Sequence, residues 1–157
     1  MTEPLFGLWT KELCAGLDGL AQMQAAADGR FPQAPMSRAL GMRVTRAERG
    51  RVFFCGRPGA DHLNTNNVVQ GGWAFSMLDT AMAYAVQTLM PEGRNSASIE
   101  VKINFLRPVL ANADYVCEAI ALGIAGDVAH AEAFLRDGAD KLIAHATASC
   151  LIRDIAL

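Results

Sequence analysis

The chain has 157 residues and a net charge of −2, which fits one domain and provides no basic surface for nucleic acid. Apolar residues make up 52% of the chain and charged residues 19%, which excludes a disordered protein because disorder requires low hydrophobicity and high charge. The apolar excess indicates either a surface that meets another subunit or an element that is buried on all sides.

The N-terminal part is predicted to be helical. Apolar side chains recur at roughly helical spacing over 5–27, so we expect an amphipathic helix there. Pro32 and Pro35 mark a loop after it. Residues 1–37 are therefore interpreted as a helix and loop that precede the main domain, 38–157.

The main domain is predicted to contain six strands and one long helix. The strands are expected at Leu40–Glu48, Arg51–Arg57, Ser98–Phe105, Tyr115–Ile124, Val128–Arg136 and Lys141–Arg153. The helix, Trp73–Met90, carries apolar side chains all round, which is typical of a core helix. Four strands in succession without a helix between them favour an antiparallel sheet and an α+β fold. Such a sheet would wrap around the helix and bury it on every side.

The third strand shows strict alternation of apolar and polar residues. Ile99, Val101, Ile103 and Phe105 alternate with Ser98, Glu100, Lys102 and Asn104. Because successive side chains of a strand point to opposite faces, we expect these two sets on opposite sides of the sheet.

Asp79 is the strongest single signal for chemistry. It is the only acid between Asp61 and Glu92, and it interrupts an apolar helix. A charged side chain is rarely buried without a partner. Two interpretations stay open: a structural aspartate bonded to a backbone group or a hydroxyl such as that of Thr80 or Ser76, and a catalytic carboxylate.

Two glycines, Gly71 and Gly72, stand at the start of that helix. The first N–H groups of a helix lack internal partners and carry partial positive charge, so they can polarise a carbonyl group that approaches closely. The alternative is a close-packed loop that needs small residues. Asn64, in the polar run before the helix, fits either a turn or a hydrogen bond to a water or carbonyl.

The remaining signals exclude several classes of protein. The four cysteines form no Cys-x-x-Cys pair, which is typical of reduced, buried thiols in a cytoplasmic protein. Lys11 and Glu12 interrupt the first apolar stretch, so no signal peptide is expected, and Asp79 argues against a membrane span. The histidines lack metal-ligand spacing, so no metal is predicted. Three cations are interpreted as solvated surface: Arg94, Lys102 and Arg107.

Four motifs together resemble one family. They are His62-Leu63-Asn64, Val69-Gln70-Gly71-Gly72, Leu78-Asp79-Thr80-Ala81 and Ile103-Asn104-Phe105-Leu106-Arg107-Pro108. Their order and spacing resemble the hotdog-fold thioesterases of the phenylacetyl-CoA thioesterase type, over about 38–153. The resemblance implies a hotdog fold, in which an antiparallel sheet of five to six strands wraps around a long central helix. Here it would carry an extra N-terminal helix.

The resemblance also implies an activity and a site. The activity is hydrolysis of an acyl-CoA thioester to a free acid and CoA, with no cofactor beyond the CoA of the substrate. Asp79 would be the general base or nucleophile, Gly71 would donate its N–H to the thioester carbonyl, and Asn64 would position the water or substrate. Further substrate contacts would come from Gln70, Gly72 and Ser98. The family forms homodimers or homotetramers with active sites at the dimer interface.

Two positions depart from the family pattern, and one distance bears on the oligomer. Gln70 replaces the usual histidine, and Asn67 replaces a glycine at a position where asparagine tolerates positive φ. The glutamine keeps open a non-catalytic acyl-CoA binding protein. A hotdog hydratase or dehydratase is a further alternative, but that chemistry usually requires a histidine–acid pair, and no histidine stands next to Gly71 and Gly72. Gly71 and Asp79 are about 12 Å apart along a helix, so they would act on one carbonyl only if Asp79 comes from a neighbouring subunit.

Overall fold

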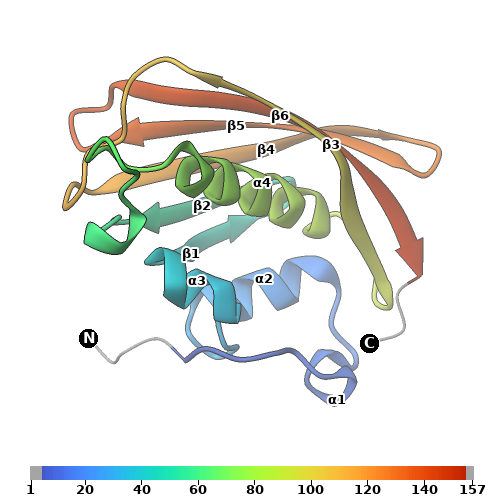
Figure 1. Cartoon of the computed structure of the whole chain (residues 1–157). Coiled ribbons are helices and arrows are strands. Elements are labelled where there is room, and N and C mark those ends of the chain that lie inside the picture. The colour runs from blue at the N-terminus through green and yellow to red at the C-terminus, as the bar shows by residue number, and fades with distance from the viewer. Residues whose placement is uncertain (1–4, 155–157) are drawn as a thin grey trace.

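The computed structural model describes residues 5–154, and its centre is a six-stranded sheet (Figure 1). In chain order the strands are β1 (Met42–Glu48), β2 (Arg51–Gly56), β3 (Arg94–Phe105), β4 (Tyr115–Ala125), β5 (Val128–Asp137) and β6 (Leu142–Asp154). Their spatial order is β1-β2-β4-β5-β6-β3, and every neighbouring pair is antiparallel. The predicted antiparallel α+β architecture is confirmed.

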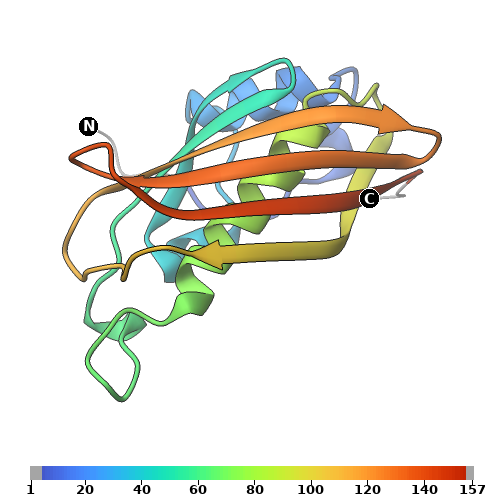
Figure 2. The same ribbon diagram turned by 90° about the horizontal axis from the view of Figure 1, so that it is seen from above.

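The long helix α4 (Gly71–Gln87) runs across the inner side of this sheet (Figure 2). Its buried face, centred on Met77, Leu78 and Met82, fills the core. Many of the buried positions on β4, β5 and β6 are alanines, among them Ala119, Ala131, Ala133, Ala146 and Ala148. Small side chains let the helix lie close to the sheet, and their burial removes apolar surface from water.

The expectation that α4 is buried on every side is wrong in one respect. A stripe along one face stays at least partly exposed: Gly72, Phe75, Ser76, Asp79, Thr80 and Ala83. These positions recur every three or four residues, the spacing of one helical face. The sheet covers the opposite face only, because it curves over one side of the helix.

The N-terminal segment differs from the predicted single helix over 5–27. Two helices occupy it, α1 (Lys11–Cys14) and α2 (Gly19–Ala27). The break has a local cause: Gly16 adopts φ 76°, and the carboxylate of Asp18 caps α2 by accepting from the N–H of Ala21.

The loop predicted around Pro32 and Pro35 contains a third helix, α3 (Pro35–Leu40). Pro35 occupies its first position, where a missing N–H costs nothing and a fixed φ favours the helix. A 3-10 turn, η1 (Ala60–His62), follows β2.

The N-terminal helices lie on the same side of the sheet as α4 (Figure 1). α2 begins against the end of α4, where the N–H of Gly19 donates to the carbonyl of Met90 at 2.9 Å. A Cβ atom at Gly19 would lie 1.8 Å from the carbonyl oxygen of Gln87, so only glycine fits this crossing. Within residues 5–154, no helix combines the length and hydropathy needed to cross a bilayer.

Candidate active site

Asp79 lies near the middle of α4, half-buried on the partly exposed stripe. Its Oδ1 accepts a hydrogen bond of 2.7 Å from the hydroxyl of Ser98 on β3. The hydroxyl of Ser76 instead donates to the carbonyl of Gly72 at 2.8 Å. One carboxylate oxygen of Asp79 is thus held by β3, which fixes the direction in which the carboxylate points.

A β-bulge in β3 brings Ser98 to this position. Ser98 pairs with Cys150 and Glu100 pairs with Ser149, so Ile99 is the extra residue between them. The extra residue turns Ser98 to the same face as Val101, toward α4. The predicted alternation, which grouped Ser98 with Glu100, is therefore wrong at this point.

Cys150 on β6 lies directly beside the Asp79–Ser98 pair. It is fully buried and is the strand partner of Ser98. Burial raises the pKa of the Cys150 thiol, the Ser98 hydroxyl lowers it in part, and the charge of Asp79 raises it further. The thiol therefore stays protonated, and it packs beside the carboxylate as a small hydrophobic side chain.

The N-terminus of α4 is a second polar position. Gln70 is the residue before the helix, with an exposed side chain, and the N–H of Trp73 is already bonded to its carbonyl. Gly71 and Gly72 therefore present the first N–H groups of the helix. A Cβ atom at Gly71 would lie 3.2 Å from Cζ of Phe105, whereas at Gly72 it would meet only Gln70, at 3.8 Å.

Phe105 also lies at the N-terminus of α4, and the sequence did not predict this. Its ring lies against Gly71 but is still more than half exposed. The alternation of β3 placed it only on one face of the sheet, together with Val101 and Ile103. Its place beside two glycines could be recognised only once the end of β3 was known to meet the start of α4.

The loop before α4 is organised by Asn64. Its Oδ1 accepts from the N–H groups of Asn66, at 2.9 Å, and Val68, at 3.2 Å. Asn67 adopts φ 60°, as predicted for a glycine-like position. The side-chain amide NH₂ of Asn64 is the group that stays available to donate to a ligand.

His62 stabilises the same loop. Its Nδ1 accepts from the N–H of Gly59 at 2.9 Å, so its Nε2 carries the proton and donates to the carbonyl of Ala39 at 2.8 Å. Both ring nitrogens are used, and the histidine ties the loop to α3. The chemistry of His62 is therefore that of a structural residue.

The site residues form two groups within one chain. Asn64, Gln70, Gly71 and Gly72 gather at the start of α4, and Asp79 and Ser98 lie two helical turns away. Eight residues at 1.5 Å each separate Gly71 from Asp79 by about 12 Å. A single thioester carbonyl cannot contact both groups of the same chain.

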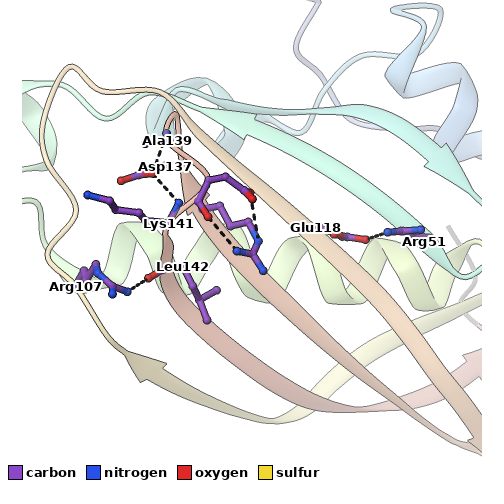
Figure 3. A network of polar contacts seen from close by, with 9 residues as sticks. Arg51, Arg107, Glu118, Asp137, Ala139, Lys141 and Leu142 are labelled. Carbon is purple, nitrogen blue, oxygen red and sulfur yellow. Dashed lines mark hydrogen bonds and ion pairs between the residues drawn. The ribbon is translucent and has the colours of Figure 1, made fainter.

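Two of the cations that were predicted to be solvated, Arg94 and Arg107, make ion-pair or hydrogen-bond contacts within the chain. Arg94 pairs with Asp154 at 3.0 Å, and Arg107 donates to the carbonyl of Leu142 at 2.5 Å. Figure 3 shows the Arg107–Leu142 contact, the polar contacts around the turn between β5 and β6, and, apart from them, the Arg51–Glu118 ion pair between β2 and β4. Across residues 5–154, no three metal-ligating side chains gather in one place.

The family follows from comparison with known sequences. A sequence model of the thioesterase superfamily matches residues 66–144, just over half of the chain. The chain belongs to the thioesterase superfamily. The chain is also similar to a protein of Archaeoglobus fulgidus, which is named provisionally as an esterase. The two are 32% identical over 84 residues. That alignment covers 54% of this chain and 53% of the relative, so the chain spans about half the length of the curated relative that it matches.

Solved structures of similar fold agree with this thioesterase-superfamily assignment. A variant of the phenylacetic acid degradation protein of Thermus thermophilus is 25% identical, with a TM-score of 0.68, over 74% of this chain and 97% of that chain. A Streptococcus mutans protein bound to acetyl CoA is 14% identical, with a TM-score of 0.67, over 74% and 91% of the two chains. The second likeness concerns the fold alone. The predicted hotdog fold is confirmed.

Proposed function

We propose that this chain hydrolyses an acyl-CoA thioester to a free carboxylic acid and CoA. The observation that carries the proposal is a carboxylate, Asp79, on the open stripe of the central helix and oriented by the hydroxyl of Ser98 at 2.7 Å. The thioesterase superfamily match and the fold shared with an acetyl-CoA-bound protein support the substrate class. CoA enters as part of the substrate, and hydrolysis needs no further cofactor.

The reaction assigns a role to each group. As general base, Asp79 takes a proton from a water whose oxygen bonds to the thioester carbon; the carbon–sulfur bond then breaks and the CoA sulfur receives a proton. As nucleophile, Asp79 would instead form an anhydride that water hydrolyses. In both cases the N–H of Gly71 donates to the carbonyl oxygen, where negative charge develops.

The other polar groups at the helix start serve binding. The free amide NH₂ of Asn64 can donate to the water or to the substrate, and the exposed side chain of Gln70 can donate and accept. At Gly72 the space beside the backbone is open, which suits close approach of a ligand. Unlike histidine, Gln70 does not titrate near neutral pH, so it acts through hydrogen bonds alone.

We infer that the working unit contains at least two copies of the chain, because Gly71 and Asp79 lie about 12 Å apart. The groups meet if Gly71 of one protomer faces Asp79 of its partner. β3 supports this: it is an edge strand that pairs only with β6 among the described residues. Exposed apolar side chains surround that edge and the start of α4, namely Phe75 (37%), Ile99 (57%), Phe105 (54%) and Leu106 (52%).

The activity is tested by measuring CoA release from short-chain, long-chain and aromatic acyl-CoAs. We expect turnover by the wild type and a loss of about 100- to 10,000-fold in Asp79→Ala, because a positioned carboxylate contributes that much to proton transfer. Full activity in Asp79→Ala contradicts the assignment of Asp79. Tight acyl-CoA binding by calorimetry without turnover would instead select the binding-protein alternative that Gln70 keeps open. Water addition to an enoyl-CoA would select a hydratase.

The shared site is tested by mixing two inactive variants. Asp79→Ala lacks the carboxylate, and Gly71→Pro lacks the N–H. If the two groups act across a dimer interface, each mixed dimer regains one intact site. A one-to-one mixture that exchanges subunits freely then recovers about a quarter of the wild-type activity. No recovery in a mixture that is shown to contain mixed dimers contradicts a shared site.

A further inference from the structure

A cavity of about 200 Å³ lies between the N-terminal segment, α4 and the beginning of β3. Its walls are Trp9, Gln22, Met23, Ala83, Tyr84, Gln87, Asn95 and Ser96. Half of these side chains are apolar and half are polar and uncharged. Such a mixture is typical of a site for a small organic group, with a few polar atoms that fix its orientation.

The cavity adjoins the Asp79–Ser98 pair on both elements that carry the pair. Ala83 is one turn beyond Asp79 on α4, so the two lie on the same face. Ser96 is two residues before Ser98 on β3, which places it on the same strand face at a distance of about 7 Å. A group two or three bonds from a carbonyl at Asp79 can therefore reach the cavity.

Trp9 forms a rigid wall of the cavity. Its indole N–H donates to the carbonyl of Pro32 at 2.7 Å. Its ring packs edge-on against Phe31, with 5.3 Å between centroids, and against Tyr84 at 6.4 Å. These contacts hold the indole in one place, so the depth of the cavity is set by the N-terminal segment.

The polar wall has unused capacity for hydrogen bonds. The Oγ of Ser96 is buried and has no hydrogen-bond partner among residues 5–154. Gln22 and Gln87 use their NH₂ groups on the carbonyls of Leu17, at 3.0 Å, and Arg94, at 3.1 Å. Their amide oxygens are left to accept. A buried polar group without a partner costs free energy that a ligand can restore.

We propose that this cavity holds the acyl group of the substrate and that Trp9 limits its length. The proposal rests on the proposed thioesterase function and adds the substrate class. An engineered cavity of about 150 Å³ binds benzene, so by proportion this cavity takes an acyl group of about eight heavy atoms. The acyl group is compact, and a hydroxyl substituent on it would bond to Ser96. Trp9, Gln22 and Met23 lie outside residues 66–144, the part of the chain that the superfamily model matches.

The test measures kcat/KM for CoA release from acetyl-, butyryl-, hexanoyl-, octanoyl- and dodecanoyl-CoA. For the wild type we expect a maximum at or below octanoyl and at least about a tenfold fall at dodecanoyl, since added methylenes meet Trp9. Trp9→Ala should shift the maximum to longer chains. Because this change also removes packing from the N-terminal segment, Ala83→Leu tests the cavity from the helix side. It should lower the hexanoyl-to-acetyl ratio by about tenfold.

A matched variant and one polar variant complete the experiment. Ala139→Leu, in the exposed turn between β5 and β6, adds the same side chain away from the cavity and should leave the profile unchanged. Ser96→Ala should lose any preference for 3-hydroxybutyryl-CoA over butyryl-CoA. An active wild type whose chain-length profile is the same in Trp9→Ala and Ala83→Leu overturns the acyl-pocket proposal alone. A wild type that releases CoA from no acyl-CoA overturns the proposed function as well.

Discussion

The substitution Gly71→Pro isolates the backbone N–H that the mechanism assigns to the thioester carbonyl. Gly71 is the first residue of α4, where proline is well tolerated because its φ is preorganised for a helix. Gln70 before it has φ −60° and ψ 133°, which suits a residue preceding proline. The substitution therefore removes one N–H and leaves the path of the backbone unchanged.

The magnitude follows from the role of the N–H and from the space around it. Loss of one donor to a developing oxyanion costs about 100- to 1,000-fold in kcat. Proline also adds a Cβ, which would lie 3.2 Å from Cζ of Phe105. Gly71→Ala adds the same Cβ but keeps the N–H. The exposed Phe105 ring can move by a few tenths of an ångström, so the alanine variant should lose only about fivefold, or about 1 kcal/mol.

The assay compares kcat and KM for CoA release by the wild type and the two variants. The expected result is a large fall in kcat for proline and a small one for alanine, with KM little changed, because the donor acts most strongly in the transition state. Equal losses in the two variants would show that contact with Phe105 causes the effect. A proline variant within about tenfold of wild type would refute the assignment of the Gly71 N–H.

Three further predictions concern other parts of the molecule. Ser98→Ala should lower kcat/KM by roughly tenfold, the effect of one hydrogen bond to a partly exposed carboxylate, and Ser98→Thr should restore most of it; no loss in the alanine variant contradicts an orienting role. Gly19→Ala would place a Cβ 1.8 Å from the carbonyl of Gln87. It should lower Tm by roughly 6–12 °C, from about 3 kcal/mol of overpacking, whereas Gly138→Ala, where a Cβ meets nothing within 4 Å, should not. Burial raises the pKa of the Cys14, Cys117 and Cys150 thiols, so they should resist a thiol reagent at pH 8 in the folded protein and react in denaturant; rapid labelling of all three in the native state contradicts this.

Features of the site that depend on local sequence were predictable. The strands begin and end close to the expected residues, apart from β3, which begins four residues before the expected Ser98. The positive φ of Asn67 followed from the tolerance of asparagine for that conformation. In these cases neighbouring residues determine the conformation, so the sequence pattern is sufficient.

Features that depend on contacts between distant residues were not predictable. Ser98 faces Asp79 only because of the bulge at Ile99, and a regular alternation of side chains conceals a bulge. The single helix expected over 5–27 fails because Asp18 caps a new helix, which then crosses α4 at Gly19. The contact of Phe105 with Gly71 joins residues 34 positions apart, and no local pattern marks it.

Part of the apolar excess of the chain lies at the surface, on and beside the partly exposed stripe of α4. A central helix in a complete core would show no such stripe, yet here Phe75 and Asp79 share it, and exposed apolar residues flank it on β3. A second copy that covered the stripe would bury these apolar side chains and bring a second set of glycine N–H groups toward Asp79. In the proposed dimer, a second copy would account for both the exposed apolar surface and the separation of about 12 Å between Gly71 and Asp79. A substitution that prevents dimerisation, such as Ile99→Lys, should for this reason abolish catalysis while each protomer stays folded.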